Sequence, residues 1–294
     1  MFQSFEFPGE VDRKFSVYRL DLNDALVSGN KFYKLKPWLA KAQRHKKGLL
    51  SCGGAFSNHL HALAAAGKQH GIKTAGLVRG LEPGNLTQTL QECQQMGMQL
   101  IAISRSEYRH RYQNEFAERY LRELHFPAIW VPEGGTDEDA VIACQEIAEL
   151  LNKAQVEQGV DAIWVAVGSG GTLAGIARAL NPNTKIYAVP VMKYWHEVRQ
   201  RVDGFLSSMQ AARISWVEGA YGGFGRCNRN CLQTHIQLEK ISGMLLDPVY
   251  TGKLMRRMLE YYENAEGQDN FPLMLHSGGL QGRRSIITEA VFSD

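Results

Sequence analysis

Short apolar runs alternate with longer amphipathic stretches along most of the chain. The runs are rich in Ile, Leu and Val, which favour β-strands. We expect strands at 48–51, 73–79, 98–104, 128–132, 161–167, 184–191, 213–217 and 271–276. Between them we expect helices at 35–46, 57–70, 86–96, 108–124, 137–157, 172–180, 195–207, 228–243, 251–264 and 280–290. Strand, crossover helix and strand in succession are typical of α/β proteins, so we predict mostly parallel sheets flanked by helices.

Size and composition fit a folded protein with two lobes. A chain of 294 residues can bury a sizeable core, and 44% of its residues are hydrophobic and 21% charged, as in ordinary globular proteins. The sequence shows no short fixed repeat and no low-complexity segment. Many of its 29 glycines stand at junctions between an expected strand and an expected helix. These junctions are where candidate chemistry concentrates.

Charge and cysteine content exclude several classes of function. The net charge of +3 is small for this length, and no long Lys/Arg run indicates a nucleic-acid partner. No apolar stretch is long enough to span a membrane, and Met1–Glu6 does not begin a secretory signal. Five cysteines without a paired framework indicate reduced thiols in a cytoplasmic protein. Cys227 and Cys231 have Cys-x3-Cys spacing, but no second ligand pair follows, so no metal site is predicted.

Two lysines stand three residues apart beside a Gly-Asn turn. Lys31 and Lys34 lie between the apolar stretch Ala25–Val27 and the apolar residues Leu35 and Trp38. A lysine in an apolar site loses part of its preference for the charged form, and a neutral amine is what forms a Schiff base with a carbonyl cofactor. Lysines at a helix start are more often solvated surface residues, so this stretch alone gives only a candidate.

The first glycine junction runs from an expected strand through Gly53 and Gly54 to Ser57, Asn58 and His59. Ser57 stands where a helix cap or first-turn residue belongs, with backbone N–H groups exposed around it. This arrangement suits a carboxylate or a phosphate. A plain serine cap is an equally good interpretation of the stretch.

The second glycine junction follows the apolar run at 162–167 and consists of Gly168, Ser169, Gly170, Gly171 and Thr172. Glycines allow backbone N–H groups to turn inward, and the start of the following helix favours a dianion. No Lys follows as in a P-loop, and the spacing does not give a dinucleotide fingerprint. The junction therefore predicts a site for a compact monophosphate.

Two tyrosines lie near further turns. Tyr250 follows an Asp-Pro stop at the start of an expected helix, and Tyr221 opens a glycine-rich loop. A third strand-to-helix junction carries His276 and Ser277 before Gly278 and Gly279. A tyrosine at a helix start can act as an acid or pack as a core aromatic, and core packing is the default for an isolated one.

These pieces, taken in order, resemble the 1-aminocyclopropane-1-carboxylate deaminase and D-cysteine desulfhydrase family. The resemblance covers about residues 15–290 and rests on five segments, which are Gly29–Leu35, Gly53–His59, Gly168–Thr172, Asp247–Lys253 and His276–Gly279. It implies a pyridoxal 5′-phosphate enzyme with the two-lobed fold type II, which is like that of the tryptophan synthase β subunit. It also implies a homodimer. We expect a small domain at 36–136 inserted into a large cofactor-binding domain made of 1–35 and 137–294, with the active site between them.

The resemblance also implies how the cofactor is held. Lys31 would form the Schiff base, and Asn58 would hydrogen-bond the phenolic oxygen of the cofactor. The loop Gly168–Thr172 would bind the phosphate, with Lys34 adding positive charge. Thr251 or Ser277 would lie near the pyridine nitrogen.

For the substrate, the resemblance implies that Lys31 also moves the Cα proton and that Ser57 holds the substrate carboxylate. Tyr221 and Tyr250 would flank the substrate and handle protons. The expected reaction is β-elimination from a small D-amino acid, most simply from D-cysteine to give pyruvate, ammonia and sulfide.

The choice of branch within the family depends on Thr251 and Ser277. By the resemblance, the deaminase branch has an acidic residue at the first position and a leucine at the second. Hydroxyls would leave the pyridine nitrogen closer to neutral, which is adequate for loss of a good leaving group such as a thiolate. The pair therefore favours D-cysteine desulfhydrase chemistry over the deaminase, which would open the cyclopropane ring to 2-oxobutanoate and ammonia.

Departures from the family pattern bear on the substrate. Tyr33 stands where an arginine is usual, and Arg19–Leu22 is a weakened form of a Lys-Arg-Asp-Asp stretch. The substrate can therefore be another D-amino acid or a β-substituted alanine. A second class of function stays open, namely a non-catalytic protein that binds a phosphorylated metabolite at Gly168–Thr172.

Overall fold

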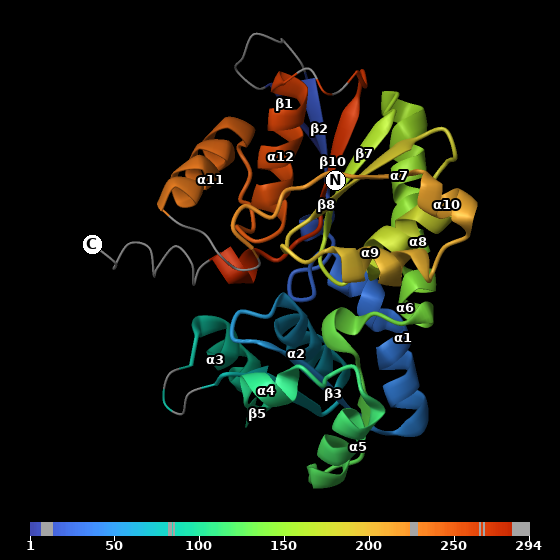
Figure 1. Ribbon diagram of the computed structural model, residues 1–294. Coiled ribbons are helices and arrows are strands. Elements are labelled where there is room, and N and C mark those ends of the chain that lie inside the picture. The colour runs from blue at the N-terminus through green and yellow to red at the C-terminus, as the bar shows by residue number, and fades with distance from the viewer. Residues whose placement is uncertain are drawn as a thin grey trace.

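The computed structural model describes residues 1–6, 14–81, 84, 86–223, 229–264, 266 and 268–283. Figure 1 shows two lobes, each built on its own sheet. The larger sheet has the strand order β1-β2-β10-β7-β8-β9. Its strands are β1 (Phe2–Glu6), β2 (Lys14–Arg19), β10 (Pro272–His276), β7 (Ala162–Val167), β8 (Lys185–Pro190) and β9 (Ile214–Trp216). Only β1 and β2 pair antiparallel among these strands, and the other pairs are parallel.

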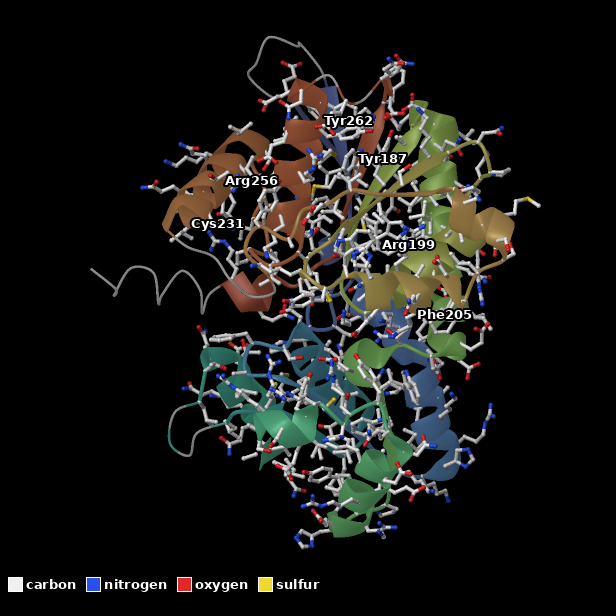
Figure 2. All side chains as sticks on the ribbon, viewed as in Figure 1. Tyr187, Arg199, Phe205, Cys231, Arg256 and Tyr262 are labelled. Atoms are coloured by element: carbon white, nitrogen blue, oxygen red, sulfur yellow. The ribbon has the colours of Figure 1, made fainter. Side chains whose placement is uncertain are left out.

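The centre of the larger sheet is buried on both faces, which explains its continuous apolar sequence. Most of β7 is buried, and its Trp164 is fully buried, with its ring stacked on Tyr187 at 4.4 Å between centroids. Figure 2 shows Tyr187 and Tyr262 in the same part of the lobe, where both hydroxyls donate to Asp269. These two hydrogen bonds fix the aromatic core over one face of the sheet.

Helices cover both faces of the larger sheet. One face packs on α7 (Gln145–Gln158) and α8 (Gly171–Ala179), and the other on α11 (Arg229–Ser242) and α12 (Thr251–Glu263). The helices α6 (Glu138–Ala143), α9 (His196–Asp203) and α10 (Ser208–Ala212) complete this lobe. None of the helices in the described part of the chain combines the length and apolar character needed to cross a membrane.

The smaller sheet has the strand order β5-β4-β3-β6 and is parallel throughout. Its strands are β3 (Gly48–Gly54), β4 (Thr74–Arg79), β5 (Gln99–Ile103) and β6 (Ala128–Trp130). Its helices are α2 (Asn58–His70), α3 (Gln88–Gln95), α4 (Arg105–Tyr108) and α5 (Asn114–Glu123), and α1 (Asn30–His45) joins the lobes. All four strands fall within 36–136, the range predicted for the small domain, whose boundaries stay a prediction.

The prediction of an α/β fold with mostly parallel sheets flanked by helices is confirmed, with local differences. The helix expected at 137–157 is interrupted at Cys144, and the helix expected at 108–124 is replaced by α4, a turn and α5. The helix expected at 280–290 begins at Leu280 but lies mostly outside the described residues, as does Cys227. The antiparallel strands β1 and β2 were not predicted, because their alternating polar positions lack the long apolar runs of the core strands.

Candidate active site

A cavity of about 560 Å³ lies between the two sheets. Segments that follow β3, β7 and β10 line it, so it lies at the carboxyl ends of strands, where ligands of α/β proteins bind. Of the predicted site residues outside the glycine loop, Lys31, Ser57, Asn58, Tyr250 and Ser277 line the cavity. All of the loop from Gly168 to Thr172 except Gly171 lines it as well, and the predicted Lys34 does not line it but donates to Ser169, which does.

Lys31 lies in the first turn of α1, which begins at Asn30 and not at 35 as predicted. Gly29 precedes the helix with φ of +75°, and a side chain there would come within 2.8 Å of the Gly278 Cα. This close approach fixes the start of α1 against the loop after β10. The Lys31 Nζ lies 3.2 Å from the Asn30 Oδ1, and burial lowers the pKa of the amine to about 8. A useful fraction of the amine is therefore neutral near pH 7.

Lys34 lies one turn further along α1 and is 1% exposed. Its Nζ donates to the hydroxyl oxygens of Thr136 at 2.6 Å and of Ser169 at 3.0 Å. Burial, together with the nearby charge of Lys31, lowers the pKa of Lys34 to about 7. An anion bound beside Ser169 would favour the charged form of this amine.

The loop before α8 has the geometry of an anion cradle. The helix begins at Gly171 and has no side-chain cap, so its first N–H groups are open to a ligand. Gly170 has φ of +91°, and a side chain there would meet the Val202 Cγ2 at 2.5 Å. A side chain at Gly171 would lie 2.8 Å from the Thr136 Cγ2. The glycines are therefore required for the backbone to reach this position.

Ser57 fulfils both interpretations of its sequence. It caps α2, because its Oγ accepts the Leu60 N–H at 3.2 Å, and it lines the cavity. The neighbouring Asn58 donates through Nδ2 to the Asp247 Oδ2 at 3.3 Å. Asp247 is 1% exposed, and burial raises the pKa of its carboxyl to about 6. Its other oxygen accepts the Val249 and Tyr250 N–H groups. Asp247 therefore holds Asn58 and Tyr250 in place.

Tyr250 and Thr251 are adjacent in sequence but differ in position. Tyr250 lines the cavity, and burial raises the pKa of its phenol, which therefore stays protonated. Thr251 is fully buried and does not line the cavity, contrary to the prediction. Its hydroxyl accepts the Asp247 N–H at 2.7 Å and faces the Asp247 carbonyl at 3.3 Å. The start of α12 directs it into the turn, away from a ligand.

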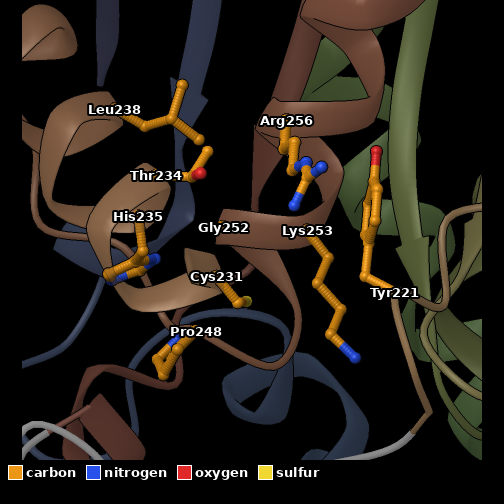
Figure 3. Close-up of a pocket in the computed structure, with 9 residues that line it drawn as sticks. All are labelled: Tyr221, Cys231, Thr234, His235, Leu238, Pro248, Gly252, Lys253 and Arg256. Carbon is orange, nitrogen blue, oxygen red and sulfur yellow. The ribbon is translucent and has the colours of Figure 1, made fainter. Parts of the chain in front are cut away.

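Tyr221 also lies away from the cavity, contrary to the prediction. Figure 3 shows it beside Arg256 in a separate pocket of about 10 Å³. Its hydroxyl donates to the Glu260 carboxylate, and the Arg256 guanidinium lies 4.2 Å from the centre of its ring. Lys253 holds this loop, since its Nζ donates to the carbonyls of Ala220 at 2.7 Å and Gly223 at 2.6 Å. These contacts keep the tyrosine on the α12 side.

Buried polar atoms without partners test which ligand the cavity fits. Asn58 Oδ1 and His59 Nδ1 are buried and have no hydrogen-bond partner among the described residues. Ser51 donates to the Val131 carbonyl, so His59 Nε2 donates to Ser51 and its Nδ1 is an open acceptor. Buried acceptors of this kind require a partner. Together with the anion cradle and the Lys31 amine, they fit a polar phosphorylated ring with a carbonyl group.

Some residues of the site were not found from the sequence. The turn Glu133–Gly135 and Thr136 closes over Lys34 and Ser169. The sequence Gly-Gly-Thr at 134–136 is the same as that at 170–172, and this repetition could have indicated that the turn belongs to the site. Asp247 was noted only as a helix stop, since its role depends on Asn58, 189 positions away. Within the described residues, no group of His, Cys, Asp and Glu side chains is arranged to hold a metal ion.

Comparison with known proteins agrees with this geometry. The family described as "Pyridoxal-phosphate dependent enzyme" matches residues 4–258. A Thermotoga maritima protein named provisionally as a 1-aminocyclopropane-1-carboxylate deaminase is 30% identical, over 91% of this chain and 90% of that protein. The mitochondrial bifunctional D-cysteine desulfhydrase/1-aminocyclopropane-1-carboxylate deaminase of Arabidopsis thaliana is 29% identical, over 90% of this chain and 72% of that protein.

A solved structure described as an ACC deaminase homologue shares the fold. It has a TM-score of 0.85 at 24% identity, and the match covers 99% of this chain and 92% of the other. The predicted fold type II and the predicted cofactor are both confirmed by these matches. The chain belongs to the pyridoxal-phosphate-dependent enzyme family and is similar to proteins named 1-aminocyclopropane-1-carboxylate deaminase and D-cysteine desulfhydrase.

Proposed function

We propose that this protein is a pyridoxal-phosphate-dependent lyase that acts on a small D-amino acid, with D-cysteine as the expected substrate. The products would be pyruvate, ammonia and sulfide. The observation that carries the proposal is the Lys31 amine, which faces the cavity with a pKa of about 8. An amine that is partly neutral near pH 7 can bind a carbonyl cofactor and can also accept a proton.

Side chains of this protein would hold the cofactor at three points. The loop Gly168–Thr172 and Lys34 would bind the phosphate, Asn58 would meet the ring oxygen, and Lys31 would bind the aldehyde carbon. When bound, the cofactor supplies an acceptor for the electrons that are released at the substrate Cα. Asn58 has a second Nδ2 hydrogen free for this contact, since Asp247 takes only one.

The remaining residues of the cavity would act on the substrate. Ser57 and the first N–H groups of α2 form a seat for the substrate carboxylate. Lys31 takes the Cα proton, and the protonated Tyr250 phenol can donate to the departing sulfur. In this proposal Tyr221 does not contact the substrate, because Glu260 and Arg256 hold it elsewhere.

The preference for thiolate loss over ring opening now depends on Ser277 alone. Its position lines the cavity, whereas Thr251 is engaged with the Asp247 backbone. By the resemblance the deaminase branch has a leucine at 277, so the hydroxyl there is the remaining difference, and a hydroxyl leaves a ring nitrogen closer to neutral. Relatives carry both names, so the substrate has to be measured.

The deciding experiment compares keto-acid release from D-cysteine, L-cysteine, D-serine and 1-aminocyclopropane-1-carboxylate by the cofactor-loaded protein. We expect D-cysteine to give the highest kcat/KM, with one sulfide per pyruvate. A preference for the cyclopropane, seen as 2-oxobutanoate, would show deaminase activity instead. Protein that binds pyridoxal phosphate but releases no keto acid from any of the four would support the non-catalytic alternative.

Assembly and location belong to the same proposal. A homodimer follows from the family resemblance, and a cytoplasmic location follows from the unpaired cysteines in the sequence. Sedimentation of the purified protein tests the first, because a monomer at micromolar concentration would contradict it.

A further inference from the structure

Five side chains form an alternating stack of guanidinium groups and phenol rings along one wall of the cavity. The order is Arg79, Tyr108, Arg111, Tyr112 and Arg201, and all five line the cavity. Each guanidinium carbon lies close to the centre of a neighbouring ring, at 5.0 Å for Arg79 over Tyr108 and at 4.5 and 4.3 Å for Arg111 over Tyr108 and Tyr112. Arg201 lies 4.8 Å from the centre of the Tyr112 ring. We call these five residues the Arg–Tyr stack.

The folding of both lobes places the Arg–Tyr stack in the cavity. In the smaller sheet, Arg79 at the end of β4 is paired in register with Gly54 at the end of β3. The guanidinium crosses over this glycine, where a side chain would meet the Arg79 Nη2 at 3.4 Å. At the other end, Arg201 comes from α9 of the larger lobe. The stack therefore spans the opening between the lobes, directly beside the loop that leads to Ser57.

The charges of the Arg–Tyr stack are not balanced. Glu133 neutralises its centre, since Tyr108, Arg111 and Tyr112 all donate to its carboxylate. Within the described residues, neither Arg79 nor Arg201 has a carboxylate partner or a hydrogen bond, and both guanidinium groups pack on phenol rings. The other carboxylate on this side of the cavity, Glu197, is exposed. Two guanidinium groups thus face the cavity without a counter-charge.

We infer that the cavity takes α-amino acids whose β-substituent carries an anionic group, such as a phosphate or a sulfonate, and that a guanidinium at one end of the Arg–Tyr stack, Arg79 or Arg201, recognises it. The inference rests on the proposed β-elimination. The cofactor phosphate and the substrate carboxylate already have separate sites at Gly168–Thr172 and at Ser57, so neither requires these arginines. A cavity of about 560 Å³ also has room for a larger β-substituent than a thiol.

The chemistry balances for a phosphorylated serine. The Cα proton goes to Lys31, and the Cβ–O bond breaks with its electron pair staying on the phosphate oxygen. Water then converts the released enamine to pyruvate and ammonia, so one O-phosphoserine and one water give pyruvate, ammonium and inorganic phosphate. A guanidinium beside the β-substituent stabilises both the bound anion and the departing charge.

The test compares an anionic and a neutral ester at the β-oxygen, O-phosphoserine and O-acetylserine, each as the D- and L-form. The cofactor-loaded wild type is compared with Arg79→Gln, Arg201→Gln and Arg201→Lys. Arg199→Gln is the matched control, because Arg199 (labelled in Figure 2) is on the same helix, pairs with Asp203 and is not among the residues that line the cavity. The readout is the ratio of kcat/KM for the phosphate ester to that for the acetate ester.

We expect this ratio to exceed one in the wild type and to fall roughly tenfold or more in at least one of the two Gln variants, while the acetate ester is changed little. Arg201→Lys should keep part of the ratio, and Arg199→Gln all of it. An equal loss for both esters would overturn the inference, since it would assign the arginines to the α-carboxylate or to folding. A wild-type ratio below one would overturn it as well.

A binding measurement separates this inference from the proposed function. Aspartate and asparagine differ by one charge and lack a leaving group, so their dissociation constants can be read from the absorbance of the bound cofactor. Tighter binding of aspartate that is lost in Arg79→Gln or in Arg201→Gln supports anion recognition even if no elimination occurs. Equal binding of both, in a protein that releases pyruvate from D-cysteine, overturns the inference and leaves the proposed function standing.

Discussion

The phosphate end of the cavity and its reactive centre are built on two lysines that lie one turn apart on α1. At the phosphate end, Lys34 donates to two hydroxyl groups and is 1% exposed. At the reactive centre, the Lys31 amine donates a hydrogen bond to the amide oxygen of the adjacent Asn30. Burial lowers the pKa of both amines, to about 7 and about 8. Lys31 and Lys34 are therefore alike in residue type and in burial, and they differ in their hydrogen-bond partners.

The difference in partners assigns the two amines to different tasks. Thr136 and Ser169 fix the Lys34 ammonium at one point, where a phosphate dianion would raise its pKa and keep it charged. Lys31 has few partners to give up, so its amine can move between the cofactor and the substrate. A fixed cation suits binding, and a loosely held amine suits proton transfer.

The strongest test of this comparison is Lys31→Ala. We expect kcat for keto-acid release to fall by roughly 10²–10⁴-fold or beyond detection, because both the covalent link and the base are lost. The cofactor should still bind through the phosphate end, with its absorbance that of the free aldehyde. If Lys31→Ala keeps the wild-type absorbance band and turnover, the reactive amine is elsewhere. Lys36→Ala, on the same helix and paired with Glu146, is the control.

The second test is Lys34→Met, which keeps the length of the side chain and removes its charge. We expect the dissociation constant for pyridoxal phosphate to rise roughly 10- to 100-fold, the value of a hydrogen bond to a charged group. At saturating cofactor, kcat should stay within a few-fold of the wild type. A variant that binds the cofactor normally but loses kcat would reverse the tasks assigned to Lys31 and Lys34. Equilibrium titration followed by absorbance separates the two outcomes.

The pH dependence of stability gives a smaller effect. In the cofactor-free protein the pKa of Lys34 is about 7, below its ordinary value of 10.5, so the unfolded chain binds more protons between these pH values. Stability contributed by this group therefore rises with pH from about 7 to 10.5, and its penalty is constant below pH 7. Between pH 7 and 9, we expect the urea concentration at the unfolding midpoint to rise for the wild type relative to Lys34→Met. Parallel pH curves for the two proteins would mean that Lys34 is not buried as an amine.

The sequence predicted the elements and ligands whose signal is local. The strand at 161–167 is mostly apolar because both faces of β7 are buried, and Gly170 in the loop after it has φ of +91°, a backbone conformation that favours glycine. Ser57 was read both as a cap and as an anion site, and it is in a position to be both. In each case the sequence signal lies within a few neighbouring residues.

What was not predicted depends on contacts between distant segments. The Arg–Tyr stack joins the end of β4, helix α4 with the turn that follows it, and helix α9. No spacing in the sequence indicates that these segments meet. Tyr221 lies outside the cavity because Glu260 and Arg256, on α12, bind its phenol. A tyrosine in a glycine-rich loop carries no sign of which side it will face.

The smallest expected effects come from the two hydroxyl residues on which the choice of branch depended, Thr251 and Ser277. Thr251→Ala removes a hydroxyl that accepts the Asp247 N–H, so it should lower the free energy of unfolding by about 0.5–2 kcal/mol, the usual cost of a lost helix-end hydrogen bond. The kcat of Thr251→Ala for D-cysteine should stay within a few-fold of the wild-type value. Ser277→Ala should do the reverse and change kcat and the cofactor absorbance with little loss of stability, because its position faces the cavity. Urea unfolding and steady-state kinetics on the same preparations compare the pair. Should Thr251→Ala alter the cofactor absorbance as much as Ser277→Ala does, the hydroxyl of Thr251 reaches the ligand after all, and both positions again bear on the choice of substrate.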